Sequence, residues 1–148
     1  MTAWRLRPAA AADAASLAAI EAAAFGAASW GARGVAEGLR DRLVETLVAD
    51  DIDTRTQGFL MWRRVGDEAE VLTLAVAPEQ QRRGCARALL DAVIDALRRE
   101  GVRALFLEVD AGNQAAIALY EGRSFDRIAR RKRYYRSGAD ALVMRADL

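Results

Sequence analysis

The sequence predicts a single-domain α/β fold in which a central mixed sheet carries helices on both faces. Two observations support this prediction. Short strand-like segments and segments of helical periodicity follow one another along the whole chain. The clearest helical segment, Gln81 to Glu100, lies between two apolar strand-like runs. Strands and helices mixed in this way pack as helices on the faces of a sheet.

The first part of the chain is expected to contain three strands and two helices. Trp4 to Arg7 alternates apolar and polar residues, as a short strand does, and Pro8 ends it. Asp13 is expected to cap a helix that continues to about Ala24, because apolar residues recur there at helical spacing. The stretch from Phe25 to Gly34 is rich in Gly, Ala and Ser and is expected to be a loop. A short helix follows at 35–42, and strands follow at 43–49 and 58–65.

The second part of the chain is expected to alternate strands with helices and to finish with two strands. The long helix ends at Gly101, because glycine commonly follows a helix C-terminus. In the next strand, side chains alternate between faces, so Glu108 points away from Leu107 and Val109. The expected strands are 70–77, 102–109, 125–135 and 141–144, and the expected helices are 81–100 and 113–121.

Length and composition fit one compact soluble domain spanning residues 1–148. Of the 148 residues, 53% are hydrophobic and 29% are charged, which is ordinary for a globular protein. No apolar run approaches the roughly 20 residues of a membrane span, and the N-terminal segment lacks the apolar core of a signal peptide. We therefore expect no membrane association, a cytoplasmic location, and a monomer or weak dimer.

The residue types that the chain lacks restrict its chemistry. The chain has one cysteine, Cys85, and no histidine. These absences exclude an intramolecular disulfide, a Ser-His-Asp triad, a Cys-His pair and a His-Glu-x-x-His zinc site, and we expect no metal. Acid–base chemistry therefore depends on carboxylates, tyrosines, the single lysine Lys132, the cysteine or water.

Basic residues gather near the C-terminus although the net charge is only +1. Lys132 and six arginines fall between Arg123 and Arg136. A solvated face explains this cluster as well as a basic lip over an anionic ligand or partner does, and both interpretations stay open. The near-zero net charge argues against nucleic-acid binding.

The segment from Gln81 to Arg87 has the features of a phosphate-binding loop. It follows a strand and opens the long helix, whose first N–H groups have no helical partner and can donate to phosphate oxygens. Gly84 allows a close backbone approach. Arg82, Arg83 and Arg87 add positive charge. The segment matches neither Gly-x-Gly-x-x-Gly nor the Gly-Lys-Ser/Thr loop of nucleotide-binding proteins, which argues against those cofactors; the alternative is an ordinary arginine-rich helix start.

Three polar residues that follow are candidates for chemistry. Glu108 is a carboxylate within an apolar strand, where burial would raise its pKa and suit it to accept a proton. Tyr120 lies about two helical turns beyond Asn113, on the same helix face. Each residue also has a structural alternative: an arginine partner for Glu108, a helix cap for Asn113 and a core position for Tyr120.

These segments resemble a known family. Gln81-x-x-Gly84-x-Ala86 resembles the coenzyme A pyrophosphate motif of the GCN5-related N-acetyltransferase family. Leu107-Glu108-Val109, followed by Asn113 and the run 115–121, is similar to that family's bacterial ribosomal-protein-alanine N-acetyltransferases, and so is the Arg-Arg-x-Arg-Tyr-Tyr run at 130–135. The resemblance covers residues 70–145 well. It implies a mostly antiparallel sheet of six to seven strands, splayed at a slot for the cofactor.

The resemblance also implies which residues hold acetyl-CoA. Leu74, Ala75 and Val76 would offer strand-edge backbone groups to the pantetheine arm. Asn113 would form a hydrogen bond near the reactive end of the cofactor. The pyrophosphate would lie on a run of six residues: Arg82, Arg83, Gly84, Cys85, Ala86 and Arg87.

The function implied by the resemblance is direct acetyl transfer to a protein N-terminal amine, with the N-terminal alanine of a ribosomal protein as the expected acceptor. Glu108 would be the general base, directly or through water, and Tyr120 would protonate the departing thiolate. About a tenth of chain N-termini are neutral at pH 7, far more than lysines, so a modest carboxylate base suits this acceptor. The alternatives are a small amine, amino acid or lysine side chain as acceptor, or a non-catalytic acyl-CoA-binding module.

Two positions depart from the family pattern. Ser124 stands where the family usually has glycine, and Gly122 is expected to end the preceding helix instead. Cys85 lies in the phosphate loop. We interpret it as a small neutral filler, although a thiol at a helix N-terminus can be unusually acidic.

Overall fold

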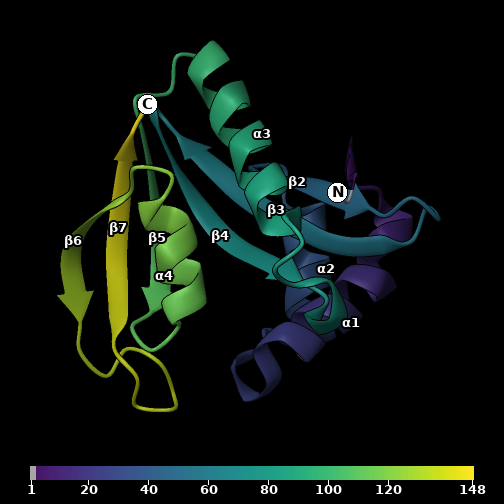
Figure 1. Ribbon diagram of the computed structural model, residues 1–148, viewed down its shortest axis with the longest axis horizontal. Helices are drawn as coiled ribbons and strands as arrows, with labels where there is room; N and C mark the ends of the chain where they lie inside the picture. Colours follow the sequence, from purple (N-terminus) through teal and green to yellow (C-terminus); the bar gives the residue numbers. More distant parts are fainter. Residues whose placement is uncertain (1–2) are drawn as a thin grey trace.

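A computed structural model describes residues 3–148 and contains a seven-stranded sheet (Figure 1). Its strands are β1 (Arg5–Pro8), β2 (Val44–Asp50), β3 (Thr56–Val65), β4 (Glu68–Val76), β5 (Ala104–Asp110), β6 (Asp126–Arg131) and β7 (Ala141–Asp147). Their order across the sheet is β1-β2-β3-β4-β5-β7-β6, and each neighbouring pair is antiparallel except β4–β5, which is parallel. The predicted fold class, with its mostly antiparallel sheet, is confirmed.

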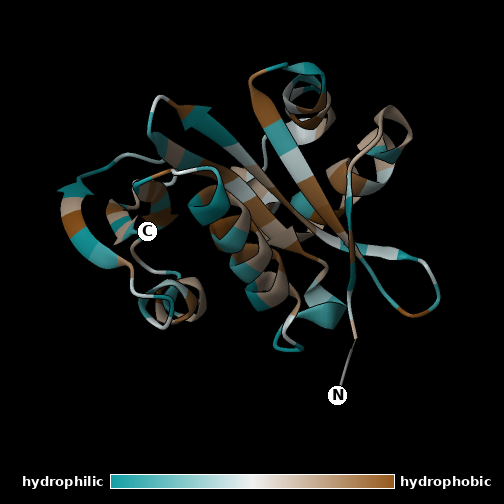
Figure 2. Cartoon of the chain, turned by 90° about the horizontal axis from the view of Figure 1, so that it is seen from above, coloured by the Kyte–Doolittle hydropathy of each residue, from teal (hydrophilic) through white to brown (hydrophobic). Residues whose placement is uncertain are grey.

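Helices cover both faces of the sheet, as the hydropathy view from above illustrates (Figure 2). They are α1 (Ala14–Phe25), α2 (Gly31–Arg40), α3 (Cys85–Arg99) and α4 (Gln114–Glu121), with short 3-10 turns at 11–13, 26–28 and 78–80. α1 and α2 pack against the face that carries Phe59 and Met61. α3 and α4 pack against the opposite face, where Leu60 and Leu107 join a larger buried cluster. The sheet therefore has an apolar core on each side.

Strands β4 and β5 separate soon after they begin. They pair only where Glu68–Glu70 lies beside Ala104–Phe106, and they diverge beyond this point (Figure 1). β5 remains paired with β7 from Ala104 to Asp110. The divergence leaves one edge of β4 without a strand partner from Val71 onward, which is the splayed slot that the family resemblance implied.

The second helix begins earlier than predicted. α2 starts at Gly31, so the expected loop over 25–34 is wrong in its last part. A Cβ atom on Gly34 would lie 2.9 Å from the Cβ of Trp30, and one on Gly38 would lie 2.9 Å from the sulfur of Met61. Glycine weakens a helix by about 1 kcal/mol per residue, but here it permits this close packing. Gly34, which suggested a loop, and Gly38 therefore serve as close packing positions within the helix.

The C-terminal strands also differ from the prediction. β6 ends at Arg131 rather than at Tyr135, and residues 132–140 form a turn-rich loop. The Asp140 carboxylate accepts hydrogen bonds from the Arg133 N–H (3.0 Å) and from Arg130 Nε (2.6 Å), which fixes this loop. At the end of α3, Gly101 has a φ of +81°, so the predicted glycine stop is confirmed.

Asp13 does not cap α1 as predicted, since its side chain makes no cap hydrogen bond to that helix. Its carboxylate instead accepts hydrogen bonds from the Ala10 N–H (2.7 Å) and from both terminal nitrogens of Arg7 (2.9 Å each). The Arg7 guanidinium holds the pKa of Asp13 below its usual range. Arg7 also contacts Asp50 at 2.7 Å, so this network joins the start of the helix to β1 and β2.

The alanine-rich segment Ala11–Ala28 is long and apolar enough, by length and composition alone, to cross a bilayer. This corrects the expectation that no apolar run approaches a membrane span. In the fold the segment is α1 with a 3-10 turn at each end. Leu17 and Ile20 pack into the core, and the carboxylate of Glu21 is buried with them. Its packing is that of a helix lying on a sheet.

Candidate active site

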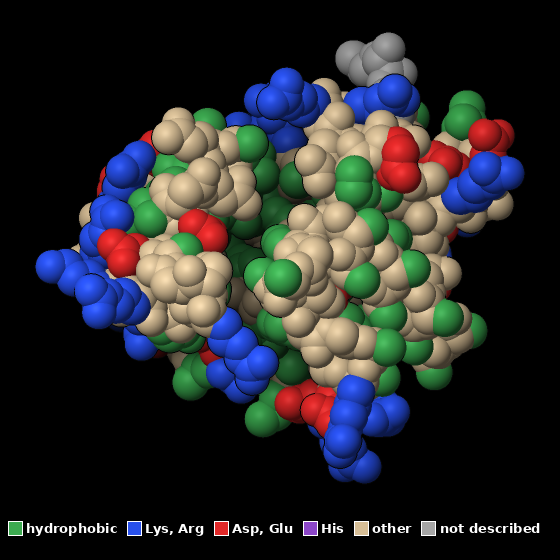
Figure 3. Space-filling model, turned by 90° about the horizontal axis from the view of Figure 1, so that it is seen from below, with side chains coloured by type: hydrophobic (Ala, Val, Ile, Leu, Met, Phe, Trp, Pro, Cys, Tyr) green, Lys and Arg blue, Asp and Glu red, His purple; other side chains and the backbone are tan. Residues whose placement is uncertain are grey.

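The slot between β4 and β5 opens into a cleft of about 630 Å³. A hollow floored by hydrophobic side chains separates two parts of the molecule in the view from below (Figure 3). The cleft is lined by β4, the loop before α3, the start of α3, one side of α4 along its length, and the end of α1. The lining includes most residues that the sequence assigned to the site: Leu74, Ala75, Val76, Arg82, Gly84, Cys85, Ala86, Arg87, Asn113 and Tyr120.

Two predicted site residues lie outside this lining. Arg83 lines a separate, more open hollow beside Trp4, whose indole N–H donates to the Arg83 carbonyl at 3.1 Å. Glu108 lies on β5 but turns to the other face of the sheet. The cleft therefore brings together the predicted cofactor residues and Tyr120, whereas Glu108 approaches from the opposite face.

The loop before α3 has the backbone geometry of an anion site. Arg82 and Gly84 both adopt left-handed conformations, with φ of +65° and +82°. Alternating conformations of this kind turn successive N–H groups toward one point. The first helical hydrogen bond at this end runs from the Ala88 N–H to the Gly84 carbonyl (2.9 Å), so the N–H groups of residues 85–87 lack a helical acceptor. This loop can therefore donate several hydrogen bonds to one phosphate group.

Strand β4 offers only alternate residues to the open slot. The Ala77 N–H donates to the Gln57 carbonyl on the β3 side (2.8 Å). In an antiparallel pair, backbone groups alternate between the two edges, so Val76 and Leu74 turn theirs to the slot and Ala75 turns its groups to β3. The Gln81 side chain already donates to the Val76 carbonyl at 3.2 Å. Of the three predicted residues, only Leu74 (N–H and carbonyl) and Val76 (N–H) therefore have backbone groups available to a ligand in the slot.

Cys85 is a packing residue at the base of the loop. It is only 2% exposed, and burial raises the pKa of its thiol to about 12. A Cβ atom on Gly58 of β3 would lie 2.8 Å from the sulfur, so the two residues fit closely. Its burial and close fit support the interpretation of Cys85 as a small neutral filler, because desolvation disfavours the thiolate.

Tyr120 forms part of the cleft wall. Its ring is buried and meets Phe125 edge-on, with 5.6 Å between ring centroids. Burial, with a smaller contribution from Tyr135, raises the pKa of Tyr120 to about 12. The backbone carbonyl of Tyr120 accepts hydrogen bonds from the N–H groups of Arg123 (2.9 Å) and Phe125 (3.1 Å). The hydroxyl is therefore protonated at neutral pH, and the backbone of Tyr120 is fixed beside the cleft.

Asn113 has the predicted structural role of capping α4. Its Oδ1 accepts a hydrogen bond from the Ala116 N–H at 3.2 Å. This leaves the side-chain Nδ2 at the cleft lining, where it can donate to a ligand. The cap and a ligand contact are therefore compatible in one side chain.

Glu108 is not buried, so the prediction of a desolvated carboxylate is wrong. Leu105, Leu107 and Val109 turn into the core under α3 and α4, while Glu108 turns to a part of the other face that α1 and α2 leave uncovered. Its side chain is 32% exposed, and Oε1 lies 3.5 Å from Arg131 Nε. Any role of Glu108 as a base must therefore depend on its position rather than on burial.

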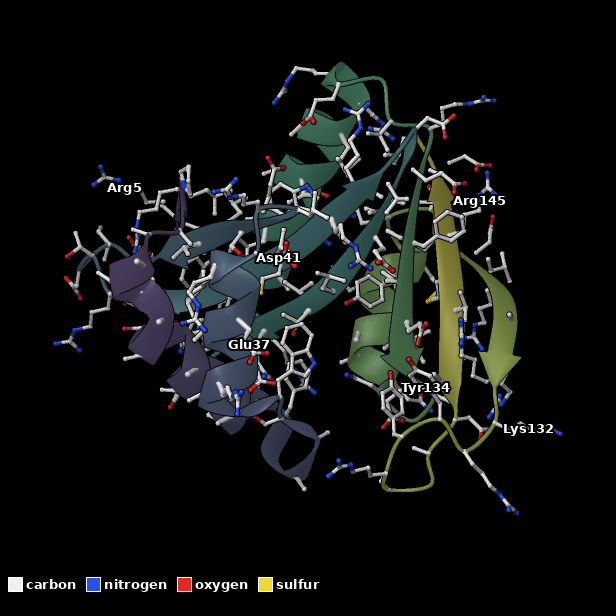
Figure 4. The ribbon with its side chains drawn as sticks, turned by 180° about the vertical axis from the view of Figure 1, so that it is seen from behind. Arg5, Glu37, Asp41, Lys132, Tyr134 and Arg145 are labelled. Carbon is white, nitrogen blue, oxygen red and sulfur yellow. The ribbon has the colours of Figure 1, made fainter. Side chains whose placement is uncertain are left out.

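Three residues around Glu108 were not assigned a role from the sequence. The Glu108 carboxylate lies near the Tyr134 hydroxyl and raises the pKa of Tyr134. The Arg131 guanidinium lies 5.4 Å from the centre of the Tyr134 ring. Tyr135 contacts Tyr134 edge-on, and burial raises its pKa to about 12. Figure 4 shows Tyr134 near the C-terminal end of β5. The Arg-Arg-x-Arg-Tyr-Tyr run was the available signal, but it was interpreted only as a strand.

The arginine-rich segment is mostly neutralised by ion pairs. The pairs are Arg123–Asp91 (2.5 Å), Arg127–Glu121 (3.1 Å), Arg130–Asp140 (2.6 Å) and Arg131–Glu108 (3.5 Å). Lys132, Arg133 and Arg136 are exposed in the loop next to Tyr134. Most of the cluster is therefore a paired face, and the loop after β6 adds three exposed cations. Within residues 3–148, no group of three or more His, Cys, Asp or Glu side chains is placed to hold a metal ion.

Comparison with known proteins identifies the family. The model of the acetyltransferase (GNAT) family matches residues 15–125. A [ribosomal protein bS18]-alanine N-acetyltransferase of Salmonella typhimurium is 45% identical over 101 residues, covering 66% of this chain and 66% of that protein. The N-alpha-acetyltransferase RimI of Mycobacterium tuberculosis is 49% identical over 81 residues, covering 54% of this chain and 49% of that protein. The matched region thus spans half to two thirds of these curated relatives.

The fold comparison extends over nearly the whole chain. The crystal structure of the ribosomal-protein-S18-alanine N-acetyltransferase from Escherichia coli superposes with a TM-score of 0.89 at 32% identity. The superposition covers 98% of this chain and 94% of the other. Together with the family match over 15–125, this agreement shows that the chain belongs to the acetyltransferase (GNAT) family.

Proposed function

We propose that this protein is an acetyl-CoA-dependent N-acetyltransferase whose acceptor is the N-terminal amine of a protein, namely the N-terminal alanine of a ribosomal protein. One observation carries the proposal. A single cleft joins a loop with the geometry of an anion site, an unpaired strand edge and the side chain of Tyr120. An extended thioester with a pyrophosphate at its far end fits these features in that order.

The residues present fit the donor at each point. The backbone of residues 82–87 would hold the pyrophosphate, with Arg82 and Arg87 at the cleft to offset its charge. Leu74 and Val76 would pair with the amides of the pantetheine arm, much as a neighbouring strand would. Asn113 Nδ2 would donate near the thioester. When bound, acetyl-CoA supplies an activated acyl group.

The proposed transfer needs two proton movements at the far end of the cleft. The neutral amine nitrogen attacks the thioester carbonyl carbon, a C–N bond forms, and the C–S bond breaks. Glu108 accepts the proton that the nitrogen loses, directly or through water. Tyr120 donates a proton to the departing sulfur, since its pKa of about 12 keeps the hydroxyl protonated. The phenolate is then reprotonated from solvent.

Two observations support a chain N-terminus as acceptor. The relatives with 45% and 49% identity are named as a [ribosomal protein bS18]-alanine N-acetyltransferase and an N-alpha-acetyltransferase. The uncovered face in front of Glu108 also gives an extended chain an approach from the side opposite the donor cleft. A ribosomal-protein acceptor would place the enzyme in the cytoplasm.

The test is a turnover assay with acetyl-CoA and a panel of acceptors. The panel contains ribosomal-protein N-terminal peptides that begin with Ala, the same peptides with a blocked N-terminus, lysine peptides and small amines. We expect transfer to the free Ala N-terminus and none to the blocked peptide. Transfer to lysine or small amines alone would refute the acceptor, and coenzyme A binding without any transfer would indicate a non-catalytic module.

A further inference from the structure

The side chain of Glu21 on α1 is a buried carboxylate that the proposed chemistry does not use. Its exposed fraction is 0%. Oε2 accepts a hydrogen bond from the Trp30 N–H at 2.6 Å, and Oε1 accepts a short hydrogen bond from the Ser29 hydroxyl. Burying a carboxylate costs free energy unless hydrogen bonds compensate. Both compensating bonds come from one short segment, the connection between α1 and α2.

This connection, residues 26–30, contains a 3-10 turn closed by the Ser29 N–H, which donates to the Gly26 carbonyl at 3.0 Å. Beyond that turn, Glu21 holds its last two residues. Left-handed glycines stand at its two ends, Gly26 with φ of +54° and Gly31 with φ of +80°. The Ser29 hydroxyl oxygen also accepts a hydrogen bond from the Gly31 N–H at 2.9 Å. One carboxylate therefore fixes the last two residues of the connection directly and the first residue of α2 through Ser29.

The connection lies at the border of the cleft. Phe25, directly before it, lines the cleft together with Tyr120. Trp30, at its end, is 45% exposed and packs along Gly34 and Gly38 of α2. α1 and α2 cover the sheet face toward which Glu108 turns, and Figure 4 shows α2 and Tyr134 on opposite sides of the space in front of β4 and β5. The connection thus faces the side from which an acceptor would arrive.

We propose that Glu21 is a positioning residue for the acceptor, because it holds Ser29 and Trp30 and so fixes the α1–α2 connection as one wall of the acceptor entrance. This inference rests on the proposed function. A connection that is already ordered spares the acceptor the entropic cost of ordering it, about 1–2 kcal/mol per backbone residue. Glu21 itself need not touch the acceptor.

The main test compares acceptor KM, kcat and coenzyme A affinity in Glu21→Ala. Losing two hydrogen bonds to a carboxylate should raise acceptor KM about tenfold or more, while the coenzyme A Kd stays within about twofold because the phosphate loop is separate. Glu21→Gln keeps an acceptor for the Trp30 N–H and should restore most of the loss. Ser29→Ala removes the bonds of the Ser29 hydroxyl to Glu21 and to the Gly31 N–H but keeps the Trp30–Glu21 bond, and it should raise acceptor KM about threefold. Glu37→Ala, an exposed glutamate on α2, is the matched control and should change nothing.

An unchanged acceptor KM in folded Glu21→Ala, or an equal rise in coenzyme A Kd, would overturn the inference. If Glu21→Ala does not fold, Ser29→Ala decides by the same criterion. If the wild-type chain acetylates no acceptor, the proposed function fails separately. In that case, deuterium exchange at the amides of residues 29–31 decides: faster exchange confined to this connection in the variants supports Glu21 as its anchor, and unchanged exchange refutes it.

Discussion

The two sides of the slot are built in different ways. The donor side uses backbone groups from one contiguous stretch, the edge of β4 followed by the loop and the start of α3. The acceptor side uses side chains from distant parts of the chain, since Glu108, Arg131 and Tyr134 come from β5, β6 and the loop after it. In the proposed function, backbone groups would recognise the invariant acetyl-CoA, whereas side chains could be changed to suit one acceptor. Substitutions on the donor side should therefore change coenzyme A binding, and substitutions on the acceptor side should change turnover without changing coenzyme A binding.

Gly84→Asp should have the largest effect and should act on the donor side alone. An added Cβ at Gly84 meets no protein atom within 4 Å, so the aspartate would project into the space in front of the loop and repel a pyrophosphate. We expect coenzyme A binding to weaken at least about a hundredfold in calorimetric titration. Gly66→Asp is the matched control: Gly66 also has positive φ (+64°) and open space, but lies in the β3–β4 turn. Normal binding by Gly84→Asp would refute the phosphate loop.

Glu108→Gln should lower turnover on the acceptor side without changing coenzyme A binding on the donor side. If Glu108 accepts the amine proton, the amide should lower kcat about a hundredfold, a typical contribution of general base catalysis. The coenzyme A Kd should not change, because Glu108 does not line the donor cleft. Glu45→Gln on β2, an exposed strand glutamate, is the control for the substitution itself. A kcat equal to that of the wild type would remove Glu108 as the base.

Tyr120→Phe should have a smaller effect and tests where the two sides meet. The phenylalanine ring retains the edge-on contact with Phe125, so the fold should persist. Loss of the hydroxyl should lower kcat about tenfold, because water can protonate the thiolate less effectively. Steady-state kinetics with a fixed acceptor measures this. Full activity would leave Tyr120 with a packing role only.

Tyr120→Phe should also change how the stability of the protein depends on pH. Folding raises the pKa of Tyr120 from 10.0 to about 12, so the folded state holds this proton more tightly than the unfolded chain. The corresponding stability is complete below pH 10 and is lost as pH rises toward 12. Denaturation midpoints of Tyr120→Phe should therefore fall less steeply over this range. Parallel curves for the two proteins would contradict the burial argument.

The same contrast explains which features could be predicted from the sequence. The phosphate loop was predictable because a strand, a glycine and a helix start are local patterns. The orientation of Glu108 followed from strand alternation, but its exposure depends on α1 and α2 leaving part of β5 uncovered. The loop after Arg131 depends on the hydrogen bonds that Asp140 accepts from Arg130 and Arg133. The residue before α2, Trp30, is held by the hydrogen bond that its N–H donates to Glu21. Side-chain assemblies of this kind have no local signature.

Ser124→Gly should have the smallest effect, a gain in stability without a change in rate. Ser124 occupies the family's glycine position with φ of +67°, whereas Gly122 has a φ of −66° and does not make the left-handed turn. A left-handed serine costs about 1–2 kcal/mol, and the added freedom of glycine in the unfolded chain offsets part of the gain, so we expect a net gain of at most about 1 kcal/mol in the free energy of unfolding.

Thr54→Gly is the matched control, because Thr54 also has a positive φ (+64°) but lies in the turn between β2 and β3. Both variants should unfold at higher denaturant concentration. The kcat of Ser124→Gly should equal that of the wild type, since the Arg123 and Phe125 N–H groups already hold the Tyr120 carbonyl. A higher kcat would instead show that the strained serine displaces the Tyr120 side chain from its position at the cleft. The turn after α4 would then help to position the proposed proton donor.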